Sequence, residues 1–387
     1  MALRVAITRW QINTISFRPS SLHINNSFSR MKHFNSNSPL AKYTKKPPNI
    51  IRIISTGVAI GVIIGTTYVY FSEYERKLPG ALINTPTSVP ILQNLPSDLK
   101  VTRKVWHNNV ENADIILFQY PTCPFCCKVR AFLDYNKVPY DIVEVDPMLK
   151  QQISWSSYKK VPILLVKCHD GYQQLTDSTM IISAMATYLK NKAFDIQDVA
   201  NFYPPVTFIG DDGKRKTDIM NKYFIMNEDE SNKSVQLNFT DERKWRQWSD
   251  DVLVHALSPN AYRTLSEAVD SFKWFSIAGE WEKNFPFWET SLMIYGGAFM
   301  MWIISKKLKK KYMLNDNVRQ SLYDECNTWV AAVEKNGGKF MGGNKPNLAD
   351  LAVYGTLSSI EGCMAFKDVQ ENTKINDWYR NMKTVVL

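Results

Sequence analysis

Two cysteines separated by two residues are the strongest chemical signal in this sequence. Cys123 and Cys126 flank a Pro-Phe pair, and residues 128–135 follow with the apolar spacing of a helix. We expect Cys123 at the N-terminus of that helix, where unpaired N–H groups and the helix dipole favour a thiolate. Thiol pKa values fall at such positions, often well below the ordinary value of about 8.5. Cys123 is therefore predicted to be a nucleophile, and Cys126, one turn further on, a resolving or structural thiol.

Other interpretations of the cysteine pair stay open. Six cysteines in 387 residues do not make a disulfide scaffold, and three of them lie within 123–127. The pair could be two incidental core cysteines. It could also be half of a zinc site, but the sequence has no second pair of this kind and no histidine pair at ligand spacing. Thiol redox or thiol-binding chemistry is the favoured interpretation, and no metal site is expected.

The pattern around the cysteine pair predicts an α/β thioredoxin (glutaredoxin-like) fold over residues 111–192. A buried strand is expected at 114–119 and another at 140–145, so that strand, helix and strand form a βαβ unit. Further strands are expected at 163–167 and 172–175. A helix over 177–189 completes the domain.

Two more motifs strengthen this prediction. Val161 and Pro162 stand just before the third expected strand. In thioredoxin-like folds a cis-proline at this place faces the cysteine pair, and the backbone of the residue before it pairs with a bound peptide or glutathione. Asp177 and Ser178 begin a helix, whose N-terminus suits the γ-glutamyl carboxylate of glutathione. Asp177 is also explained as a helix N-cap, and the two roles can coexist.

The C-terminal part predicts an all-α domain over 241–387, after a connector at 193–240. Long amphipathic stretches occur at 242–257, 314–335 and 348–362. Asn347 and Asp350 have the spacing of a capping box before an apolar helix, so both are interpreted as folding residues. Residues 291–304 are apolar but too few for a bilayer span, which favours a packed helix or a membrane-facing surface. For the aromatic-rich segment 272–288 core packing is favoured over the wall of a lipid-sized cleft.

The positive charge of the chain lies at its N-terminus. Nine of the 47 basic residues and none of the 37 acidic residues fall within 1–72, so the rest of the chain is close to neutral and a nucleic-acid partner is not expected. Residues 1–50 are interpreted as a mitochondrial targeting segment or a disordered tail. The uncharged run 53–71 is long enough to span a bilayer, and a transmembrane helix is predicted over 51–72. Residues 73–110 are interpreted as a proline-containing linker.

A glutaredoxin-like half followed by a helical half with a capping box resembles the glutathione-transferase architecture. The sequence is still more similar to the membrane-associated prostaglandin E synthase type 2 family, over roughly residues 100–385. The motifs that carry this resemblance are 120–126, 156–162, 244–248, 258–263 and 343–354. They are unrelated to one another and occur in the right order, which makes the resemblance specific.

The resemblance implies a homodimeric isomerase that converts the lipid endoperoxide prostaglandin H2 to prostaglandin E2 with glutathione. It also implies haem bound together with glutathione, and cleavage of the endoperoxide to malondialdehyde and a hydroxy fatty acid when haem is present. The family's catalytic cysteine matches Cys123 and its neighbouring tyrosine matches Tyr120. Its glutathione contacts match Val161, Asp177 and Ser178 in this sequence.

Cys127 departs from the family pattern, which has serine at this position, and a third thiol offers alternative disulfides. The acid-free N-terminus favours a mitochondrial membrane, whereas the resemblance implies Golgi and microsomal membranes; in either case a single-pass protein is expected, with release of a soluble processed form. Two other functions stay open. One is a glutathione-dependent thiol-disulfide oxidoreductase, in which Cys126 would resolve a mixed disulfide on Cys123. The other is a glutathione- and haem-binding protein without prostaglandin turnover.

Overall fold

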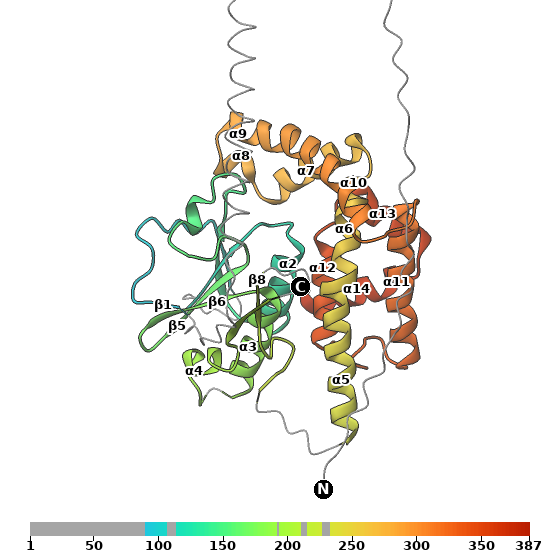
Figure 1. Ribbon diagram of the computed structural model, residues 1–387. Coiled ribbons are helices and arrows are strands. Elements are labelled where there is room, and N and C mark those ends of the chain that lie inside the picture. Colours follow the sequence, from blue (N-terminus) through green and yellow to red (C-terminus); the bar gives the residue numbers. More distant parts are fainter. Residues whose placement is uncertain (1–89, 107–113, 192, 210–214, 227–232) are drawn as a thin grey trace, which may run out of the picture. The chain divides into compact units, whose positions relative to one another are not determined.

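The computed structural model describes residues 90–106, 114–191, 193–209, 215–226 and 233–387 (Figure 1). The predicted targeting segment 1–50 and transmembrane helix 51–72 lie outside these residues. Within the described part of the chain, no helix combines the length and the apolar character that a membrane span requires.

The first half of the described chain forms a six-stranded mixed sheet in the order β1-β6-β5-β3-β4-β2. Its central strand β3 (Ile115–Gln119) is buried along its whole length and runs parallel to β4 (Tyr140–Glu144), and helix α2 (Pro124–Tyr135) connects the two. Strands β5 (Ile163–Cys168) and β6 (Gly171–Thr176) continue the sheet antiparallel, and α3 (Ser178–Lys190) follows. The thioredoxin-type fold predicted from the apolar runs is confirmed.

The segment 73–110, predicted as a linker, includes two short strands in its described part. The described part contains β1 (Ile91–Leu92), paired with β6, and β2 (Arg103–Val105), paired with β4. These strands close the two edges of the sheet. They are two and three residues long, so their sequence is too short to show the alternation that marks a strand. Backbone pairing with a sheet formed elsewhere in the chain specifies them.

The predicted connector at 193–240 also contains regular structure. Helix α4 (Ile196–Ala200) packs beside α3, and β7 (Pro205–Ile209) pairs with β8 (Arg215–Ile219) in a separate two-stranded hairpin. The first turns of α5 (Lys233–Trp248) belong to the same interval. The hairpin is mostly exposed, which is consistent with the weak hydrophobic pattern of its sequence.

The second half is helical, as predicted. A π-helical turn (Ser249–Leu253) joins α5 to α6 (Val254–Ala261), and a second π-helical segment (Leu292–Gly297) precedes α10 (Ala298–Lys311). The remaining helices are α7 (Leu265–Ala278), α8 (Trp281–Asn284), α9 (Phe287–Ser291), α11 (Val318–Lys335), α12 (Leu348–Ser358), α13 (Met364–Asn372) and α14 (Ile375–Val386).

The predicted capping box begins α12. The Asn347 side chain accepts hydrogen bonds from the N–H groups of Ala349 and Asp350, at 3.0 and 3.1 Å, and Asp350 accepts one from the Asn347 N–H at 3.0 Å. Asp350 also accepts from Trp378 Nε1 and from the Met341 N–H. The carboxylate thus holds a loop and a second helix as well as its own helix end.

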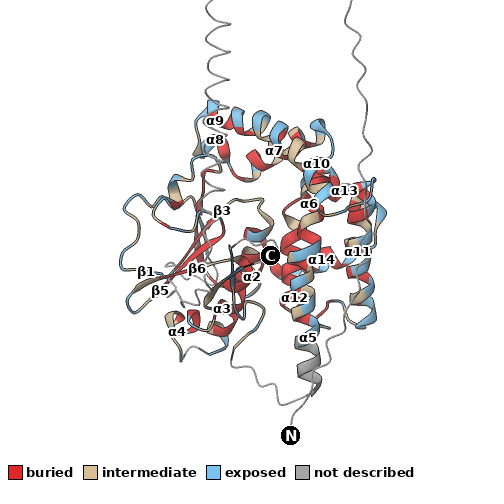
Figure 2. Ribbon diagram, in the orientation of Figure 1, coloured by how far each residue is buried: buried red, intermediate tan, exposed pale blue. Residues whose placement is uncertain are grey.

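The two halves pack through α2 and α12, where buried residues gather on both sides (Figures 1 and 2). At Gly355 of α12 the backbones approach so closely that a Cβ atom would stand 2.5 Å from Cα of Lys128 in α2. Lys128 itself is buried and forms an ion pair with Asp250 of the helical half. The helix that follows Cys123 is therefore held to the helical half at two points.

Candidate active site

Cys123 is the N-cap residue of α2, and Pro124 occupies the first turn, where its missing N–H costs no hydrogen bond. The thiol is half-buried, whereas Cys126 is fully buried beneath it. A hydrogen bond from the Cys126 side chain holds the pKa of Cys123 below its ordinary value, although burial opposes this. The N–H groups of Phe125 and Cys126 and the nearby Arg130 act in the same direction. Cys123 is thus the thiol that this helix end activates.

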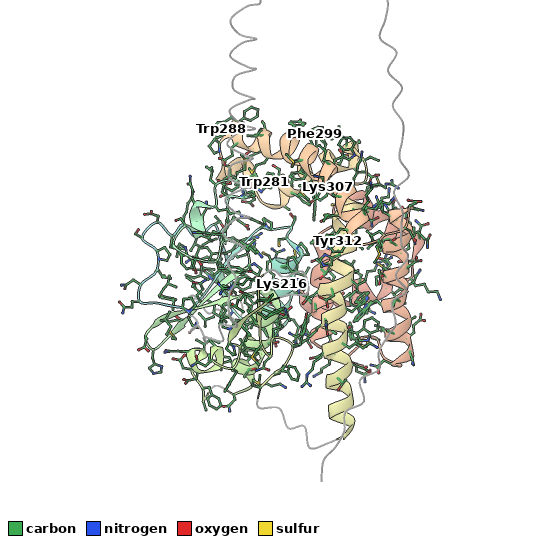
Figure 3. All side chains as sticks on the ribbon, viewed as in Figure 1. Lys216, Trp281, Trp288, Phe299, Lys307 and Tyr312 are labelled. Carbon is green, nitrogen blue, oxygen red and sulfur yellow. The ribbon has the colours of Figure 1, made fainter. Side chains whose placement is uncertain are left out.

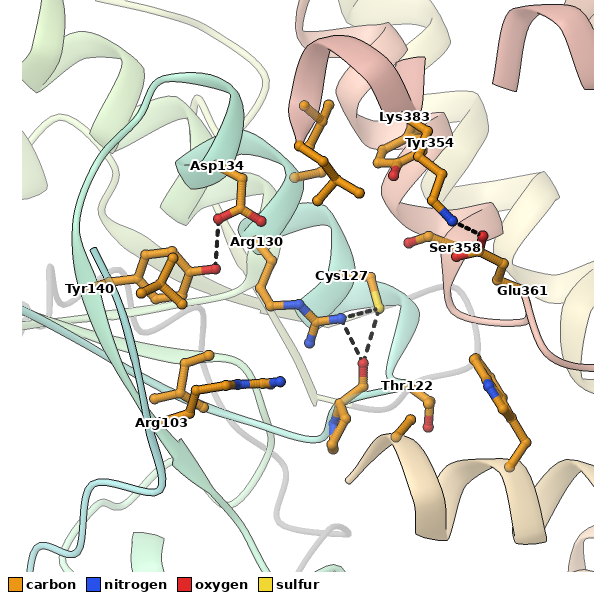
Figure 4. A pocket seen from close by; sticks show the side chains of 18 residues that line it. Arg103, Thr122, Cys127, Arg130, Asp134, Tyr140, Tyr354, Ser358, Glu361 and Lys383 are labelled. Carbon is orange, nitrogen blue, oxygen red and sulfur yellow. Dashed lines mark hydrogen bonds and ion pairs between the residues drawn. The ribbon is translucent and has the colours of Figure 1, made fainter. Parts of the chain in front are cut away.

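The other two thiols of the motif are poor nucleophiles. Burial raises the pKa of Cys126 well above the ordinary thiol value and also raises the pKa of Cys127. Cys127 lines a separate cavity of about 460 Å³ on the side of α2 that faces α12 and α14 (Figure 4). Its sulfur lies 3.2 Å from Arg130 Nη2 and 3.4 Å from the Pro121 carbonyl oxygen. Cys127 and Cys123 therefore line different cavities.

Arg130 fixes the loop that carries the motif. Its Nη1 donates to Gln119 Oε1 at 2.6 Å and its Nη2 to the Pro121 carbonyl oxygen at 2.7 Å. Gln119 ends the central strand, so one guanidinium joins the strand, the loop and the helix. Charge-assisted hydrogen bonds of this kind are stronger than neutral ones. These bonds fix the loop that carries Tyr120 and Cys123.

Tyr120 and Cys123 line a common cavity of about 780 Å³ between the two halves of the chain. That volume is in the range of ~300–1,000 Å³ that is usual for small-molecule sites. Burial, together with the nearby thiols and Asp146, raises the pKa of Tyr120 above its ordinary value. The phenol therefore stays protonated at neutral pH and is available as a hydrogen-bond donor.

The far wall of this cavity is apolar and comes from the helical half. Its residues are Tyr262, Phe272, Phe275, Trp281, Phe285, Leu292, Met293, Gly296, Gly297, Met300 and Met301. The interpretation of 272–288 as core packing is thus incomplete, because four of its aromatic side chains also face the cavity. Sequence periodicity does not separate these roles, since a cavity wall and a core show the same apolar spacing.

Glu144 is a functional candidate that the sequence reasoning missed. It ends β4, lines the same cavity as Cys123, and is 7% exposed. Its Oε1 accepts from Gln119 Nε2 at 2.9 Å, while its Oε2 has no hydrogen-bond partner among the described residues. Burial raises the pKa of this carboxyl. Glu144 could have been predicted from its position at the C-terminal end of the second expected strand. The C-terminal ends of parallel strands meet at one edge of the sheet, so this position lies near the cysteine motif that follows β3.

The predicted glutathione residues do not line the cavity that contains Cys123. The Val161–Pro162 peptide bond is cis, as in thioredoxin-like folds, and Val161 packs in one cluster with Cys126, against which Tyr120 and Cys123 also pack. Asp177 caps α3 with φ +68° and accepts from the N–H groups of Thr179 and Met180. Ser178 is buried in the first turn of that helix.

Tyr158, which the sequence shows only within the motif 156–162, packs against the cluster of Cys126 and Val161 and interacts with Asp177. Burial raises the pKa of its hydroxyl to about 12, and Asp177, Cys126 and Cys123 act in the same direction. An aromatic hydroxyl therefore stands within electrostatic reach of both the thiol pair and the start of α3. No pattern around Tyr158 distinguishes it from an ordinary loop tyrosine, so only the fold identifies it.

Comparison with known proteins adds an independent finding. The family model described as glutaredoxin matches residues 115–168. Prostaglandin E synthase 2 of Danio rerio is 46% identical over 293 residues, which cover 75% of this chain and 72% of the relative. Prostaglandin E synthase 2 of Mus musculus is 45% identical over 296 residues, covering 75% of each chain. The chain belongs to the prostaglandin E synthase 2 family.

The similarity to these two relatives confirms the resemblance to the prostaglandin E synthase 2 family that the sequence motifs indicated. Similar solved structures include glutathione transferase F7 from Populus trichocarpa, with 14% identity and a TM-score of 0.39, covering 70% of this chain and 97% of that one. They also include rice GST1 in complex with glutathione, with 15% identity and a TM-score of 0.38, covering 70% and 88%.

In this member of the prostaglandin E synthase 2 family, the helical half also supports the start of α3. Asp250 accepts hydrogen bonds from Thr179 Oγ1 at 2.6 Å and from the Tyr223 hydroxyl at 3.1 Å, and pairs with Lys128. Burial acts to raise the pKa of Asp250, but Lys128 and the two hydroxyls outweigh it and lower the pKa. The carboxylate is thus charged and joins α2 to the N-terminus of α3.

Proposed function

We propose that this chain is an isomerase that converts prostaglandin H2 to prostaglandin E2 with glutathione. The observation that carries the proposal is the half-buried Cys123, with its lowered pKa, on the wall of an apolar cavity that Tyr120 and Glu144 also line. The names of the two relatives support the same product class. A largely apolar lining with few polar groups suits a lipid endoperoxide, since its hydrocarbon chains need apolar walls and its oxygens a few donors.

We propose that glutathione binds beside Cys123, between Val161 and Pro162 on one side and Asp177 and Ser178 on the other. The backbone of Val161 precedes the paired part of β5, which begins with Ile163 opposite Thr176. The first turn of α3 offers N–H groups and a positive dipole end to the γ-glutamyl carboxylate. These features fit a tripeptide thiol whose sulfur reaches Cys123.

The proposed first step breaks the weak O–O bond. A thiolate, from Cys123 or from glutathione beside it, attacks one oxygen and forms an S–O bond, while the second oxygen leaves as an alkoxide. Tyr120 gives its proton to that alkoxide, and the product's hydroxyl results. A protonated phenol is suited to this role, and burial keeps Tyr120 protonated.

The proposed second step forms the ketone. The Glu144 carboxylate removes the hydrogen from the carbon that bears the S–O group, the electron pair forms the C=O bond, and the S–O bond breaks to release the thiolate. The proton on Glu144 then returns to the Tyr120 phenolate. Atoms and electrons balance without an external oxidant or reductant, so the reaction is an isomerisation. A buried carboxyl with a raised pKa is a stronger base than an exposed one.

Product analysis with and without glutathione tests this function. Purified protein incubated with prostaglandin H2 should form prostaglandin E2 faster than the uncatalysed control, and removal of glutathione should lower that rate. A rate that equals the protein-free control under both conditions would contradict the proposal.

A second candidate function is glutathione-dependent thiol-disulfide exchange, which the Cys126–Cys123 hydrogen bond favours. Reduction of a small disulfide, measured with glutathione and glutathione reductase, separates it from isomerisation. Exchange through both thiols requires Cys126 as the resolving residue, whereas the isomerisation described above does not.

We propose haem only as a ligand held through the thiolate of glutathione. The cavity offers an apolar wall for the macrocycle, including Phe272, Met293 and Met301, but its lining contains no lysine, arginine or histidine. When bound, haem would supply cleavage of the endoperoxide to malondialdehyde and a hydroxy fatty acid. Removing glutathione should then erase the Soret band, and a band that persists would point to a protein ligand instead.

We also propose that the protein is a homodimer attached to a mitochondrial or Golgi and microsomal membrane through residues 51–72. The 19 uncharged residues of the run 53–71 and the resemblance to the family support this. Alkaline carbonate extraction of native membranes tests the attachment. Protein that stays in the pellet supports it, and complete release contradicts it.

A further inference from the structure

Residues 287–311, from α9 to the end of α10, present an unusual outer surface, called here the 287–311 face. Large apolar side chains point outward along it: Phe287 is 85% exposed, Trp288 63%, Tyr295 60% and Phe299 49%. Figure 3 places Trp288 and Phe299 at the same outer edge of the molecule. Contiguous exposed apolar groups of this size mark an interaction surface rather than a chance exposure.

The same face continues into a row of lysines. Phe299, Ile303, Lys306 and Lys310 are spaced i, i+4, i+7 and i+11 on α10, so they share one side of the helix. Ala298 and Ser305 are buried, so an adjacent side of the helix packs against the rest of the protein. Five lysines and no acidic residue occur between 290 and 311. The outward side of α10 is therefore apolar in its first half and cationic in its second.

This surface is continuous with the cavity. Leu292 and Met300 are about half exposed, and both also line the cavity that contains Cys123. The outer face and the substrate cavity thus share the same π-helical segment and first turn of α10. A molecule that covers the 287–311 face also covers this side of the cavity.

We propose that the 287–311 face docks on a phospholipid bilayer that contains anionic lipids. Phe287, Trp288 and Phe299 would lie at the boundary of headgroups and acyl chains, with the lysines on the phosphates. Aromatic side chains favour that boundary, and each lysine near an anionic leaflet strengthens binding. Docking would place this side of the cavity against the bilayer. Entry of a lipid substrate from the membrane at this place rests on the proposed function.

The charge of the face argues for lipid over a second copy of the chain. A two-fold symmetric contact places the same patch on both sides of the interface. The only acidic residue of this segment, Glu289, is buried, so the face would bring five lysines from each copy to the interface without an exposed acidic partner from the same segment. Anionic headgroups are the partner that complements both the apolar and the cationic halves.

Photo-crosslinking in vesicles tests the proposal on the full chain. The crosslinker p-benzoylphenylalanine replaces Phe299 in one protein and Phe287 in another. The matched control places it at Phe208, which is 38% exposed on the β7–β8 hairpin. Vesicles are made of phosphatidylcholine alone or mixed with phosphatidylserine. After irradiation, mass spectrometry identifies the adducts.

We expect phospholipid adducts at 299 and 287 but not at 208, with a higher yield on phosphatidylserine vesicles. Adding K306Q, K307Q, K310Q and K311Q should lower that yield at least about fivefold. Equal lipid adducts at 208 and 299, adducts only to a second protein chain, or no adducts would each overturn the proposal. The assay does not measure prostaglandin turnover, so its failure is distinct from failure of the proposed function.

Discussion

At the scale of single residues, the site works through the contrast between two neighbouring thiols. Cys123 has a lowered pKa because it accepts a hydrogen bond from the Cys126 side chain and faces the backbone N–H groups at the start of α2. Burial raises the pKa of Cys126 well above the ordinary value. Cys123 therefore loses its proton more readily than an ordinary thiol, and Cys126 less readily. The second thiol acts here by donating to the first.

This contrast predicts the effect of Cys126→Ala. Losing the hydrogen bond should raise the pKa of Cys123 toward the ordinary value of about 8.5. A lowered pKa means that the thiolate persists to lower pH, so the variant should lose thiolate, and activity, at a higher pH than the parent. The pH dependence of Cys123 alkylation, followed by peptide mass, measures this. Cys127→Ser is the matched control, and an unchanged midpoint in Cys126→Ala would refute the assignment.

Glu144→Gln tests the proposed base. The amide retains an oxygen that can accept from Gln119 but cannot take a proton from carbon, so kcat should fall about 100-fold or more with little change in KM. Asp141→Asn is the matched control, because Asp141 lies on the same strand and also has an unpartnered oxygen among the described residues, but does not line the cavity. Equal rates for Glu144→Gln and Asp141→Asn would exclude Glu144 as the base.

The sequence predicts residues whose role depends on local spacing and misses those whose role depends on the fold. Cys123 and Tyr120 belong to one motif, and both line the cavity. Glu144 and Tyr158 lie in separate segments, and only the sheet brings them near the thiols. A carboxylate at a strand end carries no local sign of its burial.

At the scale of elements, the Asp350 carboxylate caps α12 and also binds the preceding loop and helix α14. Asp350 accepts hydrogen bonds from three backbone N–H groups and from Trp378 Nε1. Asp350→Ala leaves these donors without a partner in a buried place. Each unsatisfied donor costs about 1–3 kcal/mol, so the free energy of unfolding should fall by about 3 kcal/mol or more.

Urea unfolding of Asp350→Ala and Asp350→Asn measures this effect. The asparagine variant keeps one acceptor oxygen and should lose less stability than the alanine variant. A loss below about 0.5 kcal/mol for Asp350→Ala would contradict the role of this buried carboxylate in holding the loop and the second helix.

Helix starts are the elements that sequence predicts best here, because the signals are local. The capping box at Asn347 and the N-cap at Asp177 are predicted from the sequence, and both are present in the structure. The edge strands β1 and β2 were missed because partners far along the chain specify them.

At the scale of the whole molecule, the active-site helix is clamped between the two halves. Gly355 lets α12 approach α2 so closely that a Cβ would stand 2.5 and 2.6 Å from backbone atoms of Lys128. In an ordinary helix, Gly→Ala stabilises by about 1 kcal/mol. Here Gly355→Ala should instead lower the free energy of unfolding by about 1–3 kcal/mol, because backbone atoms cannot yield to the added methyl.

Thermal and urea unfolding measure whether Gly355→Ala raises or lowers the free energy of unfolding. A turnover assay shows whether the change also affects activity. Because α2 carries Cys123, separating α2 from α12 should also lower activity. A more stable, fully active variant would contradict this account of the interface. Sequence alone predicts both domains but not this contact, since nearly every residue of α12 is buried and the sequence does not show which side meets α2.

The central claim is that Cys123 is needed for isomerisation, and the most direct test is the turnover of prostaglandin H2 by purified, haem-free Cys123→Ser protein. We predict that prostaglandin E2 formation falls to the uncatalysed rate, while Cys126→Ser, which keeps a hydroxyl donor at that position, retains turnover. Unchanged formation of prostaglandin E2 by Cys123→Ser would contradict attack by Cys123 and leave the glutathione thiolate as the nucleophile.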